Sequence, residues 1–413
     1  MGRAKVEPVT ARSMAGETGV AGVGVEPTAR PGTLLAVASV GWFLVQGGRY
    51  LLPPLAPAIT STFHIGNAAF GLALSLLWAV YALTNFPGGI ASDDLGFRTV
   101  LVGSLVVSGL GFVGLSLAGS YPVVLVLLAV VGSGVGFFLV GSRTFISALY
   151  GPQRGRAIGL HNAAGDVGGV FAPLVAIVVL AQGSWRLPFV VVGVGAVAVA
   201  GLLHARLAGP YVLRRPPVGR ATRRAVAEIA TPEVGAVLAV YGVYVLVVQG
   251  VASFIPLYLI QSKALDPATA SLALSVFFLV GVVVKPVSGW ASDRVGRQAL
   301  TIGSLATAGV ALGALVVASG SVGVFASVVA FAGLVKLFPA ATQAYLFDQF
   351  SADASGSAFG LSRSAYVLVG SAGPALVGLG SETLGFDRTL TVLAAGLVVV
   401  ALAFGGLVRS TRT

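Results

Sequence analysis

The sequence predicts an all-α integral membrane protein with twelve transmembrane helices in two pseudo-symmetric six-helix bundles. Three observations predict this fold class. Of the 413 residues, 56% are hydrophobic and only 9% are charged, whereas soluble domains carry about 25% charged residues. The apolar residues form continuous runs long enough to span a bilayer, which favours helices over the alternating strands of a β-barrel. A short polar motif between two apolar runs also occurs twice, once in each half of the chain.

The apolar runs divide the chain into bundles, a linker and two tails. Residues 1–32 lack the apolar core and cleavage site of a signal peptide, so we expect a disordered cytoplasmic tail. We expect an N-terminal six-helix bundle at 33–208, a basic cytoplasmic linker at 209–233, a C-terminal six-helix bundle at 234–408 and a cytoplasmic tail at 409–413. The predicted helices lie in the runs 33–59, 68–91, 99–119, 122–148, 157–181, 187–208, 234–261, 268–291, 299–319, 322–349, 355–379 and 388–408.

Lys and Arg are distributed unevenly between the two sides of the predicted membrane. With the N-terminus inside, 17 of the 25 Lys and Arg residues lie in cytoplasmic tails and loops, and only Arg186, Lys263 and Arg388 lie outside. The positive-inside rule therefore predicts a multi-pass protein of the cell (plasma) membrane with both termini cytoplasmic. This topology accounts for the net charge of +11, so we expect no nucleic-acid partner. The linker 209–233 is either a solvated loop or a contact with anionic lipid.

The repeated motif is G-x-x-x-D-x-x-G. Its spacing between two apolar runs predicts a tight turn between membrane helices. The first glycine allows a neighbouring helix to approach closely. The aspartate can cap the next helix and accept hydrogen bonds from Arg, and the second glycine permits a positive φ. The fixed positions are Gly89, Asp93 and Gly96 in the first copy, and Gly289, Asp293 and Gly296 in the second copy.

Other residues recur at a nearly constant offset between the halves. The pairs are Gln46-Gly47 with Gln249-Gly250, Pro53 with Pro256, Gly159-Leu160 with Gly360-Leu361, and Pro173 with Pro374. With the repeated turn, this pattern resembles the major facilitator superfamily of secondary transporters over about residues 33–408. The resemblance implies two halves that rock around a midplane site. We expect the two turns to act as gates that hold the cytoplasmic side closed in one state, together with Arg98, Arg294 and Arg297.

The chain departs from the pattern of this superfamily at two places. Asp94 stands where the first turn usually carries Arg or Lys. The Arg expected early in the fourth helix, which is linked to proton coupling in many exporters, is absent, and Leu127, Leu128 and Ala129 occupy that region. The second departure disfavours a drug/proton antiporter.

Five cations and one clear acid fall inside the predicted helices. A charge at mid-membrane costs roughly 2.5–3.5 kcal/mol, so such residues are functional candidates by default. They lie on helices that line the central cavity in the transporters that this chain resembles. The cations are Arg49, Arg143, Lys285, Lys336 and Arg363, and the acid is Asp166.

We expect Arg49 and Arg363, one from each half, to bind the substrate. Arg49 lies about 24 Å along the first helix, which is too deep for its charge to reach the interface. We expect Gln46 and Tyr366 to contribute to the same site. Further polar and aromatic candidates are Trp78, Tyr81, Asn162, Tyr241, Tyr244, Gln249 and Gln343.

The other charged candidates each have two interpretations. Lys336 contacts the substrate or pairs with Asp166 or a backbone carbonyl. Lys285 contacts the substrate or extends to the membrane interface, and its Lys-Pro-x-x-Gly sequence resembles the Arg-Pro-x-x-Gly of monocarboxylate and nitrate carriers in the superfamily. Arg143 is expected to be a gate or interfacial residue. Asp166 is either a proton-coupling site or part of a permanent ion pair.

The excess of cations predicts a small organic or inorganic anion as substrate, carried with protons or exchanged for another anion. Alternatives are proton-coupled efflux of a hydrophobic or drug-like compound, and a non-transporting receptor or scaffold on the same fold. We expect no enzymatic activity and no cofactor, because no catalytic cluster or nucleotide-binding loop is visible. No metal site is expected, since cysteine is absent and the three histidines are scattered. The expected partners are the substrate and the lipid bilayer, and we expect a monomer.

Overall fold

The fold was analysed in a computed structural model that describes residues 30–212, 214, 218–350 and 355–410. The expected N-terminal tail lies outside the described residues up to residue 29, as do residues 411–413 of the expected C-terminal tail. The helices are α1 (Pro31–Tyr50), α2 (Ala56–Phe63), α3 (Asn67–Leu95), α4 (Phe97–Leu117), α5 (Tyr121–Tyr150), α6 (Arg154–Ala181), α7 (Leu187–Arg206), α8 (Val218–Ile229), α9 (Pro232–Lys263), α10 (Pro267–Val295), α11 (Arg297–Val317), α12 (Gly320–Asp348), α13 (Ser355–Gly370), α14 (Ala372–Thr383) and α15 (Phe386–Ser410), with a 3-10 turn η1 at Gly151–Gln153.

The described chain is helical and crosses the molecule twelve times. By length and composition, ten stretches are apolar enough to span a membrane, and one of them, Tyr121–Ala181, runs through both α5 and α6. The pair α1–α2 supplies the remaining crossing, and α13–α14 together form one crossing. The predicted fold class is therefore confirmed.

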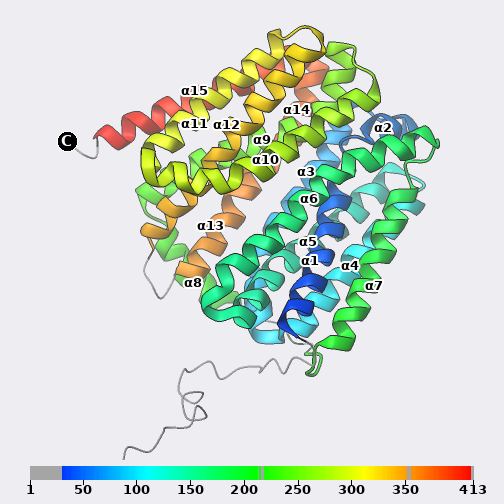
Figure 1. Cartoon of the computed structure of the whole chain (residues 1–413), viewed down its shortest axis with the longest axis vertical. Coiled ribbons are helices and arrows are strands. Elements are labelled where there is room, and N and C mark those ends of the chain that lie inside the picture. The colour runs from blue at the N-terminus through cyan, green and yellow to red at the C-terminus, as the bar shows by residue number, and fades with distance from the viewer. Residues whose placement is uncertain (1–29, 213, 215–217, 351–354, 411–413) are drawn as a thin grey trace, which may run out of the picture.

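The crossings form two bundles that meet along a limited interface. Helices α1–α7 pack with one another in the N-terminal half, and α9–α15 do so in the C-terminal half. Between the halves, α14 and α13 pack on α3, and α10 packs on α6. Figure 1 shows the halves converging toward the end that holds α2 and α14, and diverging toward the end that holds α8.

Three local features differ from the predicted helices. The run 33–59 is broken after Tyr50, because Pro53 and Pro54 cannot donate the backbone hydrogen bonds that would continue α1. The run 355–379 is broken at Ser371, three residues before Pro374. Pro173 and Pro256, the repeat partners, lie inside continuous helices. The linker is also not simply a loop, since α8 forms within it.

In both repeated turns, the second glycine has the expected positive φ, but the first glycine does not have the expected close contact with a neighbouring helix. Gly96 and Gly296 have φ values of 80° and 90°, which glycine adopts without strain. A Cβ at Gly89 would lie 3.5 Å from the nearest atom, and one at Gly289 would meet nothing in the described chain within 4 Å. The expected close helix approach at these two glycines is therefore wrong for this state.

Close approaches occur instead within each bundle. The first helix of each half crosses the fifth through paired glycines: Gly47 faces Gly168, and Gly250 faces Gly373. A Cβ added at Gly168 would lie 2.6 Å from a backbone oxygen of α1, and one at Gly373 would lie 2.0 Å from a backbone oxygen of α9. Since backbone atoms cannot yield as a flexible side chain can, these glycines fix α1 on α6 and α9 on α14.

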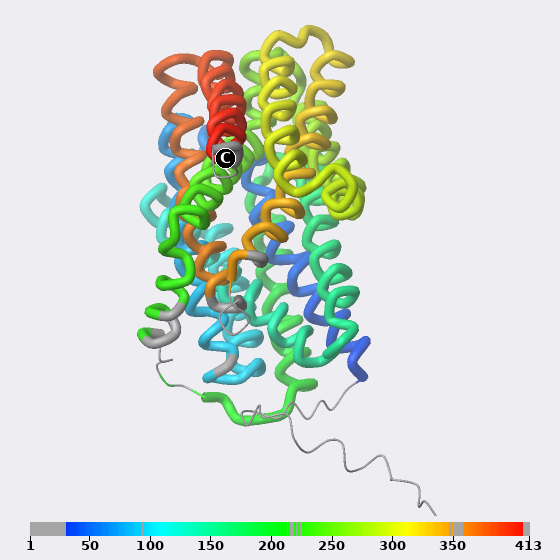
Figure 2. The backbone as a smooth tube through the Cα atoms, turned by 90° about the vertical axis from the view of Figure 1, so that its left-hand side faces the viewer, coloured from blue at the N-terminus to red at the C-terminus, as the bar shows by residue number. Residues whose placement is uncertain are grey.

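The two sides of the molecule differ in charge. We call the side on which α1 begins and α7 ends the basic side, and Figure 2 shows both helix ends at the lower end of the molecule. The described Arg residues in or beside its loops include Arg98, Arg154, Arg156, Arg206, Arg214, Arg294 and Arg297. The other side, which includes the α2–α3 and α9–α10 connections, is the opposite side.

The halves are closed against each other on the opposite side. The Asn67 Nδ2 donates to the Ser381 Oγ at 3.1 Å, and the backbone N–H of Ala68 donates to a carboxylate oxygen of Glu382 at 2.9 Å. Gly71 lies against Pro374, where an added Cβ would be 2.3 Å from the carbonyl oxygen. These contacts join α3 to α14 near their opposite-side ends, so the two halves cannot separate there without breaking them.

We predict that Gly71→Ala opens the opposite side. The new methyl group cannot fit beside the backbone of Pro374, so α3 and α14 must move apart. A single cysteine at Ser253, which is buried beyond the cavity, should then react faster with a reagent applied from the opposite side. Gly103→Ala is the matched control, because a Cβ at Gly103 meets nothing in the described chain within 4 Å. Equal labelling of the two variants would contradict this account of the closure.

Candidate functional site

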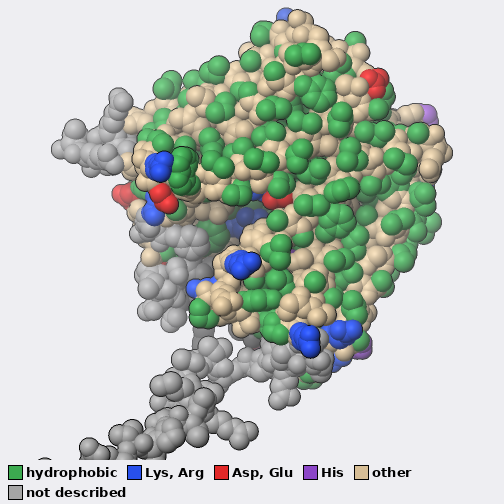
Figure 3. Space-filling view, in the orientation of Figure 1, with side chains coloured by type: hydrophobic (Ala, Val, Ile, Leu, Met, Phe, Trp, Pro, Cys, Tyr) green, Lys and Arg blue, Asp and Glu red, His purple; other side chains and the backbone are tan. Residues whose placement is uncertain are grey.

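A cavity of about 560 Å³ lies between the two halves. Figure 3 shows a hollow between them with basic and acidic side chains inside it. It opens toward the basic side, since its lining includes Ile158 near the start of α6, Ser288 near the end of α10 and Phe359 near the start of α13. The polar and aromatic residues expected from the sequence all line it, namely Gln46, Trp78, Tyr81, Asn162, Tyr241, Tyr244, Gln249, Gln343 and Tyr366.

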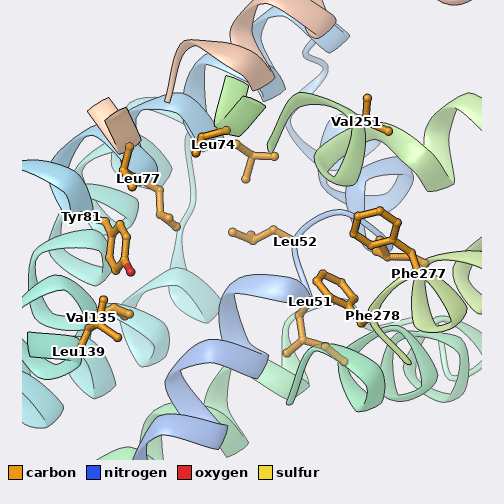
Figure 4. Close-up of a cluster of buried hydrophobic side chains, with 14 of the residues drawn as sticks. Leu51, Leu52, Leu74, Leu77, Tyr81, Val135, Leu139, Val251, Phe277 and Phe278 are labelled. Carbon is orange, nitrogen blue, oxygen red and sulfur yellow. The ribbon is translucent and has the colours of Figure 1, made fainter. Parts of the chain in front are cut away.

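Apolar side chains close the cavity toward the opposite side. Leu51 and Leu52 follow Arg49 in the break of α1, and Leu74 belongs to the turn of α3 that precedes Trp78. Figure 4 places Leu52 between Leu74 and Phe278, and all three belong to one buried cluster. This cluster therefore closes the described cavity toward the opposite side, and the cavity opens toward the basic side.

Arg49 lies at the closed end of the cavity with 3% of its surface exposed. It is in the last turn of α1, and the break after Tyr50 leaves the negative end of the helix dipole beside its charge. The guanidinium carbon lies 4.3 Å from the centroid of the Trp78 ring and 4.5 Å from that of the Tyr81 ring. The Nη2 donates to Gln46, whose amide in turn donates to the Tyr50 hydroxyl at 3.0 Å.

Arg363 approaches the same tyrosine from the C-terminal half. Its Nη2 donates to the Tyr81 hydroxyl at 3.1 Å. The structure therefore brings together the two arginines that we expected to bind substrate, with Tyr81 between them. Within the described chain, the Nε and Nη1 of Arg49, the Nε of Arg363 and the hydroxyl of Tyr366 are buried without a hydrogen-bond partner. Buried donors without acceptors are costly, so these atoms favour binding of a ligand with acceptor oxygens.

Asp166 pairs with Lys285. The Lys285 Nζ lies 2.5 Å and 2.6 Å from the two carboxylate oxygens. The pair joins α6 of one half to α10 of the other, and both residues line the cavity. The pairing of Asp166 with Lys336 that we considered is therefore wrong for this state, and Lys285 does not extend to the membrane interface.

Lys336 lies on the C-terminal wall of the cavity. Its Nζ is 4.6 Å from the centroid of the Phe277 ring and 5.9 Å from that of Phe278. The side chain runs past Gly281, where an added Cβ would lie 3.3 Å from its Cε. The absence of a side chain at Gly281 thus makes room for this lysine between α10 and α12.

Arg143 is placed in the cavity and not at the interface. Its Nε and Nη2 both donate to the side-chain oxygen of Asn162, at 3.2 Å and 2.8 Å. Asn162 is the repeat partner of Arg363, so the same position carries a cation in one half and the acceptor for a cation in the other.

Three further residues that shape the cavity were not among the sequence candidates. Tyr50 lies four residues after Gln46, a helical spacing that could have indicated it. Trp42 also lines the cavity and stacks on His161, with ring centroids 5.9 Å apart. His161 is fully buried between the hydroxyls of Ser39 and Ser142, at 3.3 Å and 2.9 Å, which fixes α1, α5 and α6 around it. No sequence pattern predicts this three-helix contact.

The first repeated turn is tied to the segment that follows α7. The carboxylate of Asp94 accepts two hydrogen bonds from Arg214, at 3.0 Å and 2.5 Å, and its backbone oxygen accepts a third at 3.1 Å. Arg98 donates to the backbone oxygens of Gly209 and His204. The unusual acid at Asp94 therefore attaches the linker to the N-terminal half. The side chain of Asp93 lies outside the described part of the structure.

The second turn has a different environment. Asp293 is exposed, and the Arg294 guanidinium lies 4.1 Å from the centroid of the Trp290 ring. Neither α4 nor α11 has a side-chain hydrogen bond at its N-cap, which is the glycine of the turn in each case. The cap position itself therefore has no side chain in either turn, and capping by the motif aspartates stays a prediction. Arg297 begins α11.

Comparison with known families agrees with this architecture. The family model described as "Major Facilitator Superfamily" matches residues 38–262 and 234–413. The chain belongs to the major facilitator superfamily. It is accordingly a multi-pass membrane transporter of this superfamily and not an enzyme.

Relatives within the superfamily carry several names. The chain is 28% identical over 283 residues to the membrane sensor protein UhpC of Salmonella typhimurium, a match that covers 63% of this chain and 64% of that protein. It is 25% identical to the probable sulfoacetate transporter SauU of Cupriavidus necator (90% and 92% covered). It is also 25% identical to the hexuronate transporter of Bacillus subtilis (86% and 88% covered).

Solved structures of this superfamily share the fold. An inward-facing bacterial homologue of the human lysosomal transporter Spinster aligns with a TM-score of 0.78 at 18% identity, over 91% of this chain and 96% of that one. The xylose transporter XylE from E. coli, in a partially occluded inward-open conformation, aligns with a TM-score of 0.71 at 13% identity, over 90% and 96% of the two chains.

We predict a measurable but small coupling between Asp166 and Lys285. The Lys285 side chain is 45% exposed in the cavity, so water screens the pair and the interaction energy should be about 0.5–1 kcal/mol. The coupling can be measured by thermal unfolding in a double-mutant cycle of Asp166→Asn, Lys285→Met and the double variant. The loss of stability in the double variant should be smaller than the sum of the losses in the two single variants. Asp166→Asn combined with Arg388→Met should be additive, because Arg388 lies at the start of α15 outside the cavity lining and does not pair with Asp166. Additivity in both cycles would contradict the pairing.

Proposed function

We propose that this transporter carries a small organic anion by alternating access, coupled to protons or in exchange for another anion. The anion is bound between Arg49 of the N-terminal half and Arg363 of the C-terminal half. The observation that carries the proposal is the set of buried donors on both arginines that lack an acceptor among the described residues. A carboxylate, sulfonate or phosphate supplies the missing acceptors and compensates the charge.

The charge balance of the cavity supports the same class of substrate. Five cations line it, whereas Asp166 is the single acid among its described lining residues, and Lys285 already neutralises it. Arg49 and Arg363 interact with aromatic rings, an amide and a hydroxyl, none of which carries a negative charge. A neutral or cationic substrate would leave this excess uncompensated in a low-dielectric region, which is unfavourable.

The names of two relatives agree with an anionic substrate. Sulfoacetate and hexuronate both carry acidic groups, and the two transporters named for them align over most of this chain. A third relative is named as a membrane sensor. This name favours a second candidate function, in which the protein binds the anion and signals its presence but does not transport it. Uptake or exchange of a labelled anion by reconstituted protein separates these functions, because a sensor binds without moving the anion.

We further propose that the basic side is cytoplasmic and that the membrane is the cell membrane. The structure then represents an inward-open state. The halves 33–208 and 234–408 would rock about the cavity as a monomer, with the linker 209–233 in the cytoplasm. In the alternative state, the turns at Gly89–Arg98 and Gly289–Arg297 would meet and close the basic side, with Arg143 closing the cavity beneath them.

We propose that Asp166 couples protons to this cycle through its ion pair with Lys285. Since the two residues belong to different halves, protonation of the carboxylate removes an attraction that holds α6 to α10. The proton would thereby change the balance between the two states. Lys285, released by that protonation, adds a further cation to the cavity and favours the anion.

We predict that Arg49→Lys and Arg363→Lys each weaken anion binding despite keeping the charge. Lysine provides a point charge where arginine provides two parallel donors, and losing a charge-assisted hydrogen bond costs about 1.5–3 kcal/mol. The affinity should fall about tenfold to a hundredfold. It can be measured as ligand-induced thermal stabilisation of purified protein with a panel that includes sulfoacetate and glucuronate.

The control for this experiment is Arg388→Lys, an exposed arginine at the start of α15 on the opposite side. Its affinities should equal those of the parent. Equal affinity in all variants, or a preference of the parent for neutral or cationic ligands, would overturn the anion site. The second result would favour efflux of a hydrophobic compound, for which the aromatic walls of the cavity are also suited.

We predict that Asp166→Asn abolishes proton-driven accumulation of the anion and spares exchange. The amide cannot take up or release the proton, whereas the arginines that bind the anion are unchanged. Reconstituted vesicles with an imposed pH gradient give the first rate, and vesicles preloaded with unlabelled anion give the second. Uphill transport with a normal pH profile in this variant would place the coupling elsewhere.

A further inference from the structure

The cavity contains two separate groups of positively charged side chains, which belong to different helices. The first is formed by Arg49 and Arg363, which meet at Tyr81 of α3. The second is Lys336 of α12, whose ammonium lies over the rings of Phe277 and Phe278 of α10. Both positions line the same cavity, so a single ligand can contact both.

Aromatic side chains separate the two positions. The Tyr50 ring, next to Arg49 in sequence, lies 4.3 Å from the Phe278 ring by centroid distance. Lys336 lies over Phe278 and the neighbouring Phe277. One carboxylate held between the two arginines at Tyr81 therefore leaves Lys336 beyond the Tyr50–Phe278 pair, where a second acceptor is needed.

Lys336 makes no direct ion pair with any described residue. Its Nζ has neither an ion pair nor a hydrogen bond among the described side chains and backbone groups. The one acid of the cavity lining, Asp166, is engaged by both oxygens with Lys285. Contact with phenylalanine rings contributes only about 0.5–2 kcal/mol, less than the cost of a desolvated ammonium.

We propose that the substrate is a dianion with two acidic groups joined by a short chain, of which a dicarboxylate is the simplest form. One group binds Arg49 and Arg363, and the other binds Lys336. The connecting atoms lie against the rings of Tyr50 and Phe278. This assignment rests on the proposed function, and it adds the number and placement of the acidic groups.

The dianion also explains how one ligand can draw the halves together. Arg49 belongs to the N-terminal half, whereas Arg363 and Lys336 belong to two separate helices of the C-terminal half. A ligand held at both positions therefore crosses the cavity between the halves and contacts α1, α13 and α12 together. A monoanion at the arginines alone leaves α12 without a contact, so it provides less of the differential binding that favours the closed state.

The test compares matched pairs of ligands on the purified full-length protein. The dicarboxylates malonate, succinate, glutarate and adipate are each paired with the monocarboxylate of equal chain length, propionate, butyrate, valerate and hexanoate. Affinities are measured by ligand-induced thermal stabilisation. The dicarboxylate of best-fitting length should bind about tenfold to a hundredfold more tightly than its partner, the gain of one charge-assisted bond.

Lys336→Met should remove this preference and leave the affinity for the monocarboxylate nearly unchanged, whereas Lys336→Arg should retain the preference. Arg388→Met is the matched control, because it removes one exposed positive charge outside the cavity. A dicarboxylate preference that persists in Lys336→Met would overturn the assignment of Lys336. If Lys336→Met does not fold, the comparison of dicarboxylates with monocarboxylates on the parent protein still tests whether the substrate is a dianion.

The outcomes distinguish this inference from the proposed function. Equal affinity of the parent protein for each matched pair would overturn the dianion and leave the anion site at the arginines intact. Binding of none of the carboxylates, together with binding of neutral or cationic ligands, would overturn both.

Discussion

The cost of holding positive charge inside an apolar bundle is the constraint on which this structure depends. Among the described residues, five cations line one cavity, and one acid of the lining balances one of them. The remaining charge is distributed over aromatic faces, an amide, a hydroxyl and a helix C-terminus, all of which stabilise a cation less than a carboxylate does. A bound anion is therefore the component that best completes the cavity.

The two broken helices place the arginines at this position. The break after Tyr50 ends α1 beside Arg49, and the break at Ser371 ends α13 two turns after Arg363. A proline lies beside each break, but in each repeat pair only one member is broken. The two halves thus have the same arrangement of membrane crossings, but their helices are broken at different positions. This difference lets a repeated fold form an asymmetric site.

The closed opposite side and the open basic side have separate physical origins. On the opposite side, glycines let α3 and α14 meet at backbone distance, and an apolar cluster around Leu52 excludes water. On the basic side, the cavity opens between the halves. The first turn is bonded to the linker through Asp94 and Arg214, whereas the second has an exposed aspartate.

The sequence by itself determined the class of fold and the membership of the cavity. Continuous apolar runs, the repeated turn and the constant offset between halves predicted two six-helix bundles. The cost of a charge in lipid identified Arg49, Arg363, Lys336, Lys285, Arg143 and Asp166, all of which line the cavity. These inferences succeeded because hydropathy and desolvation act on each residue regardless of its partners.

Only the tertiary structure decided which residues pair and which state is adopted. Asp166 joins Lys285 and not Lys336, Arg143 joins Asn162, and His161 joins two serines from other helices. The first glycines of the turns make no close contact in the described chain here. Such outcomes depend on the rotation and separation of helices that are distant in sequence. A one-dimensional pattern fixes which face of a helix is polar, but not which polar face of another helix it meets.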